Sequence, residues 1–394
     1  MRSLQQIVGQ ALQAHRVREC RVCVALSGGI DSVALLDVLR SLSPAHRLQL
    51  SAVHVNHGLS PRAAQWESFC SRLCARLRIP LLVERVQVDR ADELGLEAAA
   101  RRARYAVFAR QRSDFVATAH HLDDQAETFL LQLLRGAGAR GLSAMPAAGA
   151  RKGTAPALLR PLLAATRDEI EAHARSRGLA WMEDESNRDT ALDRNFLRHE
   201  ILPRLASRFP GYRQTLARAA HNLADASTLL EALARVDMNG VDAAQGLPLR
   251  ILRELPPVRA LNLLRYLFAV QGVAPPRRAA LEEGLRQCLA ARRDAQVRVV
   301  CGAHSLRRYR DRVFLVAERV LPAGWSRSWQ GEERIELPAE LGSLLFLAVE
   351  GQGLSRRLVA AAPLNVRFRR GGERMALARN RPHRDLRQLF QEAG

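Results

Sequence analysis

Six consecutive residues near the N-terminus have the side chains and backbone freedom of a phosphate-binding loop: Ser27, Gly28, Gly29, Ile30, Asp31 and Ser32. Two adjacent glycines let the backbone turn tightly and let a phosphate approach it. The N–H groups that begin a following helix present partial positive charge to that phosphate. Serine hydroxyls add donors, and a carboxylate such as Asp31 is a ligand for Mg²⁺. The segment lacks the lysine and the spacing of a GxxxxGK[ST] loop, and the competing interpretation is a simple helix cap after a glycine turn.

A second group of side chains, suited to proton transfer, lies further along the chain: His120, Asp124 and Glu127. The two acids are three residues apart in a predicted helix over residues 123–134, so they share one face, and His120 precedes them by one turn. An amine nucleophile has a pKa of ~10.4 and must lose a proton before it attacks. We therefore predict that these three residues bind an ammonium and accept its proton. Two alternatives stay open: acids that merely suit the helix dipole, or metal ligation by His120, His121, Asp123 and Asp124.

The elements that must position these groups alternate regularly between strand and helix. Apolar runs predict strands over residues 21–26, 48–55, 81–88 and 115–119, and helical spacing follows over 30–42, 63–77, 97–110 and 123–134. Strands that alternate with helices of this length indicate βαβ crossovers and a parallel sheet covered on both faces. The predicted fold class is therefore α/β, with a doubly wound, Rossmann-like parallel sheet. Both groups of chemical residues fall at the carboxyl ends of strands, where such sheets bind ligands.

The rest of the chain predicts two further domains. Helical patterns resume after the Gly- and Ala-rich segment 135–153, and Pro210-Gly211 suggests a boundary. We predict a catalytic domain over residues 1–208, a mainly helical domain over 209–320, and a small α+β domain over 330–394.

Composition narrows the class of partner. The formal net charge is +20, and residues 206–394 carry more of the excess than residues 1–205. Such an excess favours a polyanionic partner, because neutralised phosphates release counterions; the alternative is a genomic bias towards arginine. The six cysteines are too few and scattered for a disulfide framework. The absence of a long apolar stretch or a secretory signal predicts a cytoplasmic protein without a membrane partner.

The order of several short segments carries a specific family resemblance. The loop at 27–32 resembles the pyrophosphate loop of the PP-loop (N-type ATP pyrophosphatase) superfamily. Further segments point to one family within this superfamily: 54–58 (HVNHG), 97–105, 117–128 (ATAHHLDDQAET), 135–142, 160–163 (RPLL), 183–187 (EDESN), 194–198 (RNFLR) and 365–374. In this order they resemble the tRNA(Ile)-lysidine synthetase family, densely over the first two hundred residues or so.

The resemblance implies a reaction and a set of ligands. ATP, with Mg²⁺ held by Asp31, adenylates O2 of the wobble cytidine in an isoleucine tRNA with a CAU anticodon. The ε-amine of free L-lysine then attacks C2 and expels AMP, and the product pairs with A instead of G. Asp31, His120, Asp124 and Glu127 are then catalytic.

The resemblance also implies binding roles around the predicted catalytic residues. Asp124 and Glu127 bind the lysine substrate. His54, Asn56, His57 and Arg101 join the loop in binding the nucleotide. The remaining predicted substrate contacts are Arg104, Arg194, Asn195 and Arg198, with Arg160, Asp184 and Asn187 at the mouth of the site. The oligomeric state stays open, and a homodimer is one option.

One departure from the family and three rival functions bear on this interpretation. The chain stops at Gly394, where the family continues through a Pro-Pro-Trp-like segment, so we expect an incomplete third domain. A tRNA thiolase of the same superfamily needs a sulfur relay, yet Cys20 and Cys23 precede the first strand. An amide-forming ligase supplied by glutamine needs a glutaminase domain, and the sequence shows no such signature. An inactive RNA-binding protein has no use for Asp31, Asp124 and Glu127.

Overall fold

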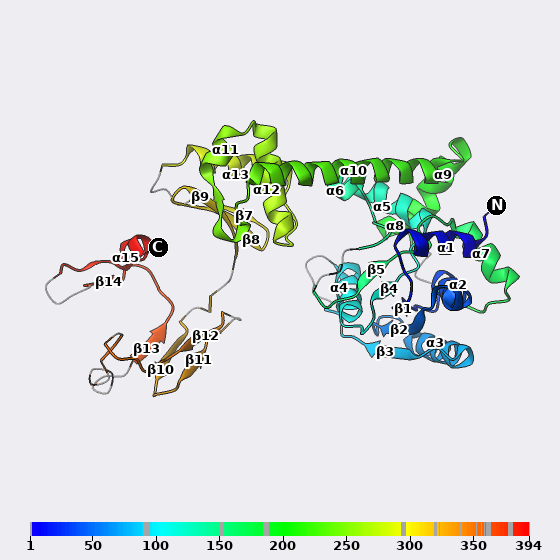
Figure 1. Cartoon of the computed structure of the whole chain (residues 1–394), viewed down its shortest axis with the longest axis horizontal. Helices are drawn as coiled ribbons and strands as arrows, with labels where there is room; N and C mark the ends of the chain where they lie inside the picture. The colour runs from blue at the N-terminus through cyan, green and yellow to red at the C-terminus, as the bar shows by residue number, and fades with distance from the viewer. Residues whose placement is uncertain are drawn as a thin grey trace. The chain divides into compact units, whose positions relative to one another are not determined.

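The computed structural model divides the chain into two compact units, Met1–Ala232 and Leu233–Gly394 (Figure 1). The predicted division into three domains stays a prediction. The structure describes residues 2–89, 95–149, 151, 153–183, 189–292, 297–318, 321–322, 324–338, 341–351, 353–355, 357, 359, 364–376 and 381–393. Within these residues, no helix combines the length and apolar character needed to cross a membrane.

A five-stranded parallel sheet organises the N-terminal unit, which confirms the predicted fold class. Its strand order is β3-β2-β1-β4-β5. The strands are β1 (Arg21–Ala25), β2 (Gln49–Asn56), β3 (Leu81–Arg85), β4 (Phe115–Ala117) and β5 (Ala157–Leu159). The strand order reverses direction at β1, since β2 and β4 flank it. In parallel sheets ligands bind at such a point, beyond the carboxyl ends of the strands.

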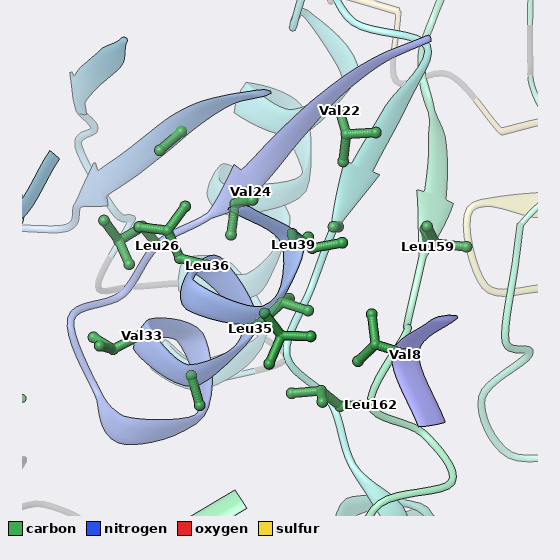
Figure 2. Close-up of a cluster of buried hydrophobic side chains, with 14 of the residues drawn as sticks. Val8, Val22, Val24, Leu26, Val33, Leu35, Leu36, Leu39, Leu159 and Leu162 are labelled. Carbon is green, nitrogen blue, oxygen red and sulfur yellow. The ribbon is translucent and has the colours of Figure 1, made fainter. Parts of the chain in front are cut away.

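Helices pack on both faces of this sheet. Val22 and Val24 of β1 belong to the larger core cluster, whereas Cys23 between them belongs to a smaller cluster with Phe108. This alternation follows from the two-residue period of a strand. Helices α1 (Leu4–Ala14), α2 (Ile30–His46), α3 (Ala63–Leu77) and α7 (Arg167–Ser176) supply the larger cluster, and α4 (Leu96–Ala109) supplies the smaller one. Figure 2 shows Val22, Val24, Leu35 and Leu39 meeting between β1 and α2.

Among the remaining helices of this unit are α5 (Leu122–Leu134), α6 (Ala139–Leu142), α8 (Asp193–Phe196), the π-helical turn η2 (Leu197–Ile201) and α9 (Leu202–Arg208). Of these, α5 carries Asp124 and Glu127, and α8 and the turn after it carry the arginines that pair with them. The long helix α10 (Tyr212–Met238) follows, and its Tyr212 packs with Ala126 and Leu202 in a small buried cluster.

The C-terminal unit contains a second core and several short hairpins. An antiparallel sheet of order β6-β9-β8-β7 packs with three helices. Its elements are η3 (Ala243–Gln245), β6 (Leu247–Pro248), α11 (Leu249–Glu254), α12 (Pro257–Val270), α13 (Arg278–Ala290), β7 (Arg298–Cys301), β8 (His304–Tyr309) and β9 (Arg312–Ala317). Three two-stranded pairs follow, from β10 (Ser326–Trp329), β11 (Arg334–Glu336), β12 (Ser343–Leu345), β13 (Leu364–Arg367), β14 (Arg374–Met375) and β15 (Arg384–Asp385), and α15 (Leu386–Ala393) ends the described chain.

Candidate active site

The glycine-rich loop connects β1 to α2 and is held in a tight turn. Gly28 has φ +93°, and a Cβ added there would lie 3.1 Å from a ring atom of Trp66 and 3.2 Å from Cys70 Sγ. The position therefore requires glycine for both its backbone angle and its space. The Ser32 hydroxyl accepts a hydrogen bond from Gly28 N (3.1 Å) and donates to Gly29 O (2.9 Å). Gly29 caps α2 without a side-chain hydrogen bond, which suits a loop whose N–H groups serve a ligand.

The imidazole of His121 joins the glycine-rich loop to the acidic helix. Its Nε2 lies 3.9 Å from Asp31 Oδ1 and 3.5 Å from Asp124 Oδ2, although the two acids follow different strands. Asp31 Oδ1 is buried and has no hydrogen-bond partner. Burial raises the pKa of Asp31, against the opposing charges of His121 and Arg167. Asp31 and Asp124 therefore share one partly buried site, as the sequence predicts from their places at the sheet edge.

Asp124 is partly buried and is held from two sides. Its side chain is 14% exposed; its Oδ2 accepts a hydrogen bond from the His121 backbone N (3.0 Å) and its Oδ1 from Arg198 Nη2 (3.3 Å). Burial opposes ionisation of Asp124, but the charges of His121 and Arg194 outweigh it, so its pKa lies below the ordinary value. Asp124 is thus a carboxylate at neutral pH, as ammonium binding requires.

Glu127 is fully buried, and two arginines occupy its carboxylate. Arg194 Nε donates to Oε2 (2.8 Å), while Arg198 donates through Nε to Oε1 (2.7 Å) and through Nη2 to Oε2 (3.0 Å). Arg194 lies on α8 and Arg198 in the π-helical turn η2. π-helical turns are uncommon and concentrate at functional sites. The predicted acid Glu127, itself fully buried, therefore orders the partly buried predicted arginines Arg194 and Arg198.

The neighbouring His120 has a different environment from His121. Its Nδ1 lies 2.9 Å from Thr118 Oγ1. Burial, together with the arginines around it, lowers the pKa of His120 to about 3 despite the opposing charge of Asp124. His120 is therefore neutral across the physiological range. The ring between the two acids belongs to His121, which the sequence indicated only as a metal-ligand alternative.

Of the residues at the end of β2 that are predicted to bind the nucleotide, two have hydrogen-bonded side chains and one has a buried nitrogen without a partner. His54 Nδ1 lies 2.9 Å from Leu26 O, and Asn56 donates to Glu67 (3.0 Å). His54 thus contacts the residue that follows β1, and Asn56 joins the end of β2 to α3. His57 Nδ1 is buried without a hydrogen-bond partner, and burial lowers the pKa of this imidazole, with the positive charge of Arg104 adding to the effect.

Arg101 and Arg104 lie on α4, beside these residues. The Arg101 guanidinium donates to the Tyr105 hydroxyl (2.9 Å) and lies 4.7 Å from the centre of its ring. Arg104 Nε is buried without a hydrogen-bond partner, and burial lowers the pKa of Arg104, as does the charge of Arg101. Asn195 donates from Nδ2 to Asp189 O (2.9 Å), which fixes the start of α8. Asp184 and Asn187 lie outside the described residues.

Two arginines that the sequence analysis did not assign complete the site. Arg167, at the start of α7, donates from Nη1 to Asp31 Oδ2 (2.5 Å) and from its backbone N to Asp123 Oδ2 (2.9 Å). Arg213, at the start of α10, donates to the other oxygen of Asp123. A sequence signal for Arg167 does exist, because a cation in the first turn of a helix opposes the helix dipole.

The described residues contain no group of three or more His, Cys, Asp or Glu side chains arranged to hold a metal ion, which removes support from the four-residue metal alternative. A Mg²⁺ ion that travels with a nucleotide needs fewer protein ligands, since phosphates and waters complete its shell. Asp31 Oδ1 fits this role, because it is a buried carboxylate oxygen with no hydrogen-bond partner beside the glycine-rich loop.

The fold and the loop define the class, and comparisons with known proteins agree. A family model described as a PP-loop domain matches residues 1–205, so the chain is a PP-loop protein and an ATP user. The U34-tRNA thiolase NcsA from Methanococcus maripaludis, with its [4Fe-4S] cluster, is similar in fold, with a TM-score of 0.50 and 19% identity over 56% of this chain and 78% of that one.

Further matches identify the family within this class. Models of the TilS substrate binding domain and the TilS substrate C-terminal domain match residues 247–314 and 364–394. The tRNA(Ile)-lysidine synthase of Nitrosomonas europaea is 43% identical over 95% of this chain and 82% of its own length, and that of Serratia proteamaculans is 39% identical over 98% and 87%. The chain belongs to the tRNA(Ile)-lysidine synthase family, and the predicted resemblance is confirmed.

Proposed function

We propose that this chain is an ATP-dependent ligase that joins L-lysine to C2 of the wobble cytidine in the isoleucine tRNA with a CAU anticodon, forming lysidine. The observation that carries the proposal is the position of His121 between Asp31 of the phosphate loop and Asp124 of the acidic helix. A phosphate held by the loop and an ammonium held by Asp124 would then meet in one site. Membership of the family supports the same reaction.

The reaction takes two displacements. In the first, the cytidine O2 attacks the α-phosphorus of ATP, the bond to the β-phosphate oxygen breaks, and pyrophosphate leaves. In the second, the neutral lysine ε-amine attacks C2, the C2–O2 bond breaks, and AMP leaves with that oxygen. The attacking ammonium must first lose a proton, which Asp124 is placed to accept because it is ionised and partly exposed.

The proposed roles of the other residues follow from their contacts. Glu127 holds Arg194 and Arg198 at the substrate side of the site, and these guanidinium groups would offset negative charge on the adenylated cytidine. Asp31 would hold Mg²⁺, which would shield the phosphate charges when bound. His57 and Arg104 present unpaired buried nitrogens to a polar ligand at the end of β2.

The protein would recognise the anticodon of the tRNA as a single strand and would bind the rest of the tRNA through its phosphates. An unpaired base is accessible at its Watson–Crick edge, and C2 becomes reachable once the cytosine leaves the stack. The formal net charge of +20 supplies the electrostatic attraction. ATP and tRNA as substrates support a cytoplasmic location for the proposed activity.

A trapping experiment tests this order of steps. With α-labelled ATP, Mg²⁺ and tRNA but no lysine, we expect label to accumulate on the tRNA as the adenylated cytidine, and added lysine should release it as AMP. Asp31→Ala should prevent labelling, whereas Asp124→Asn should permit labelling but slow release. Release of AMP by a sulfur donor instead of lysine would overturn the proposal in favour of thiolation.

A further inference from the structure

Arg167 has an unusual position for a cation. It is the first residue of α7, where the helix dipole disfavours positive charge. The helix start is nevertheless tightly defined: Thr166 accepts a hydrogen bond from Glu169 N (3.2 Å), and Glu169 accepts one from Thr166 N (2.8 Å). Asp123 fixes the Arg167 backbone as well. The backbone of Arg167 is thus fixed beside the site.

The starts of three helices meet at this point. Arg167 of α7 contacts Asp31 in the first turn of α2 and Asp123 in the first turn of α5. Each helix start presents partial positive charge, so the point attracts an anion with several charges. Asp31 and Asp123 offset part of this charge. A bound Mg²⁺ ion would compete with the guanidinium for Asp31.

We propose that Arg167 is a ligand of the pyrophosphate leaving group: its guanidinium, which pairs with Asp31, moves to the phosphates when Mg²⁺-ATP binds. The proposal rests on the proposed function, since it assigns a residue to its first step. The glycine-rich loop contains no lysine, and Arg167 brings a guanidinium to it from another helix. Its side chain is 42% exposed, which leaves room to turn from a carboxylate to a phosphate. Guanidinium forks match phosphate oxygens in geometry.

The test measures binding of pyrophosphate with Mg²⁺, and separately of Mn²⁺ alone, to the full chain. Calorimetry follows the pyrophosphate and electron paramagnetic resonance follows the Mn²⁺. We expect Arg167→Gln to weaken pyrophosphate binding by about tenfold to a hundredfold, the range for one lost hydrogen bond to a charged group. Mn²⁺ alone should bind Arg167→Gln at least as tightly as wild type, because the competing cation is gone. Arg167→Lys should recover part of the pyrophosphate affinity.

The matched control is Arg175→Gln, which removes an arginine from the same helix that pairs only at the surface with Glu171. It should bind both probes like wild type, and tRNA binding by all variants should report an intact fold. Unchanged pyrophosphate binding in Arg167→Gln would overturn the proposal. A parallel loss of Mn²⁺ binding would also overturn it, since Arg167 would then only position Asp31. Failure of wild type to transfer lysine would instead refute the proposed function, independently of these binding results.

Discussion

Replacing Glu127 by Gln tests whether this acid acts mainly through the two arginines that it holds. The carboxylate is fully buried and accepts three hydrogen bonds at 2.7–3.0 Å from Arg194 and Arg198. A neutral amide removes the buried charge that pairs with these two partly buried guanidinium groups. Breaking a buried ion pair in this way costs about 3–5 kcal/mol in the free energy of unfolding. For a unit of this size each kcal/mol lowers Tm by about 2–4 °C, so we expect a loss of about 6–20 °C.

Thermal unfolding followed by circular dichroism measures this loss. The control is Glu171→Gln, whose side chain is 38% exposed and pairs with Arg175 on the same helix. An exposed pair of this kind contributes less than about 1 kcal/mol, so the control should unfold close to wild type. If Glu127→Gln kept the wild-type Tm but lost lysine transfer, Glu127 would act on the substrate directly, and the ion-pair reasoning would be refuted.

Four further predictions address the loop, the acid, a buried imidazole and the tRNA. Gly28→Ala should cost about 1–3 kcal/mol in stability, because φ +93° strains an L-residue, and should weaken ATP binding. Asp124→Asn should lower lysine transfer by about 10²–10⁴-fold while tRNA binding stays near normal. His120 has a pKa of about 3 in the folded chain and ~6.5 in the unfolded chain, so between these values the unfolded chain binds more protons. Stability therefore falls as the pH drops through this window, and His120→Gln should flatten the slope of stability against pH. Affinity for tRNA should fall by orders of magnitude between ~50 and ~200 mM salt.

Each of these predictions has a clear contrary result. Wild-type ATP affinity in Gly28→Ala would show that the loop tolerates a Cβ. Full lysine transfer by Asp124→Asn would remove the proposed ammonium site. If His120→Gln left the slope of stability against pH unchanged between about pH 4 and 6, the imidazole would titrate as in free histidine. Flat salt dependence would argue against phosphate contacts with the basic surface.

The architecture of the N-terminal sheet was predictable where strands are long and apolar. Strands near residues 21–26, 48–55, 81–88 and 115–119 appear at these places, because their periodicity is set by local sequence. Strand β5 escaped prediction: it has three residues after a Gly- and Ala-rich segment, and its pairing with β4 is a long-range interaction. Helix α1 was also missed, although its buried Leu4, Ile7 and Val8 follow helical spacing.

For the site, the sequence predicted the edge of the sheet at which the side chains gather, but not how they pair. Asp31 and Asp124 lie close together because each follows a strand of the parallel sheet, and the sequence pattern predicts both strands. The pairing of Glu127 with Arg194 and Arg198 depends on how α8 and a π-helical turn pack on α5, which no local pattern encodes. Arg167 carried the signal of a cation at a helix start, but its partner Asp31 is 136 residues away, so the contact itself was not predictable.

Incorporation of labelled lysine into an isoleucine tRNA transcript with a CAU anticodon tests the central claim most directly. The account predicts incorporation that requires ATP and Mg²⁺, is lost when the wobble cytidine is changed, and is lost in Asp31→Ala. Incorporation that persists without the wobble cytidine, or an active wild-type ATPase that transfers no lysine to this tRNA, would contradict it.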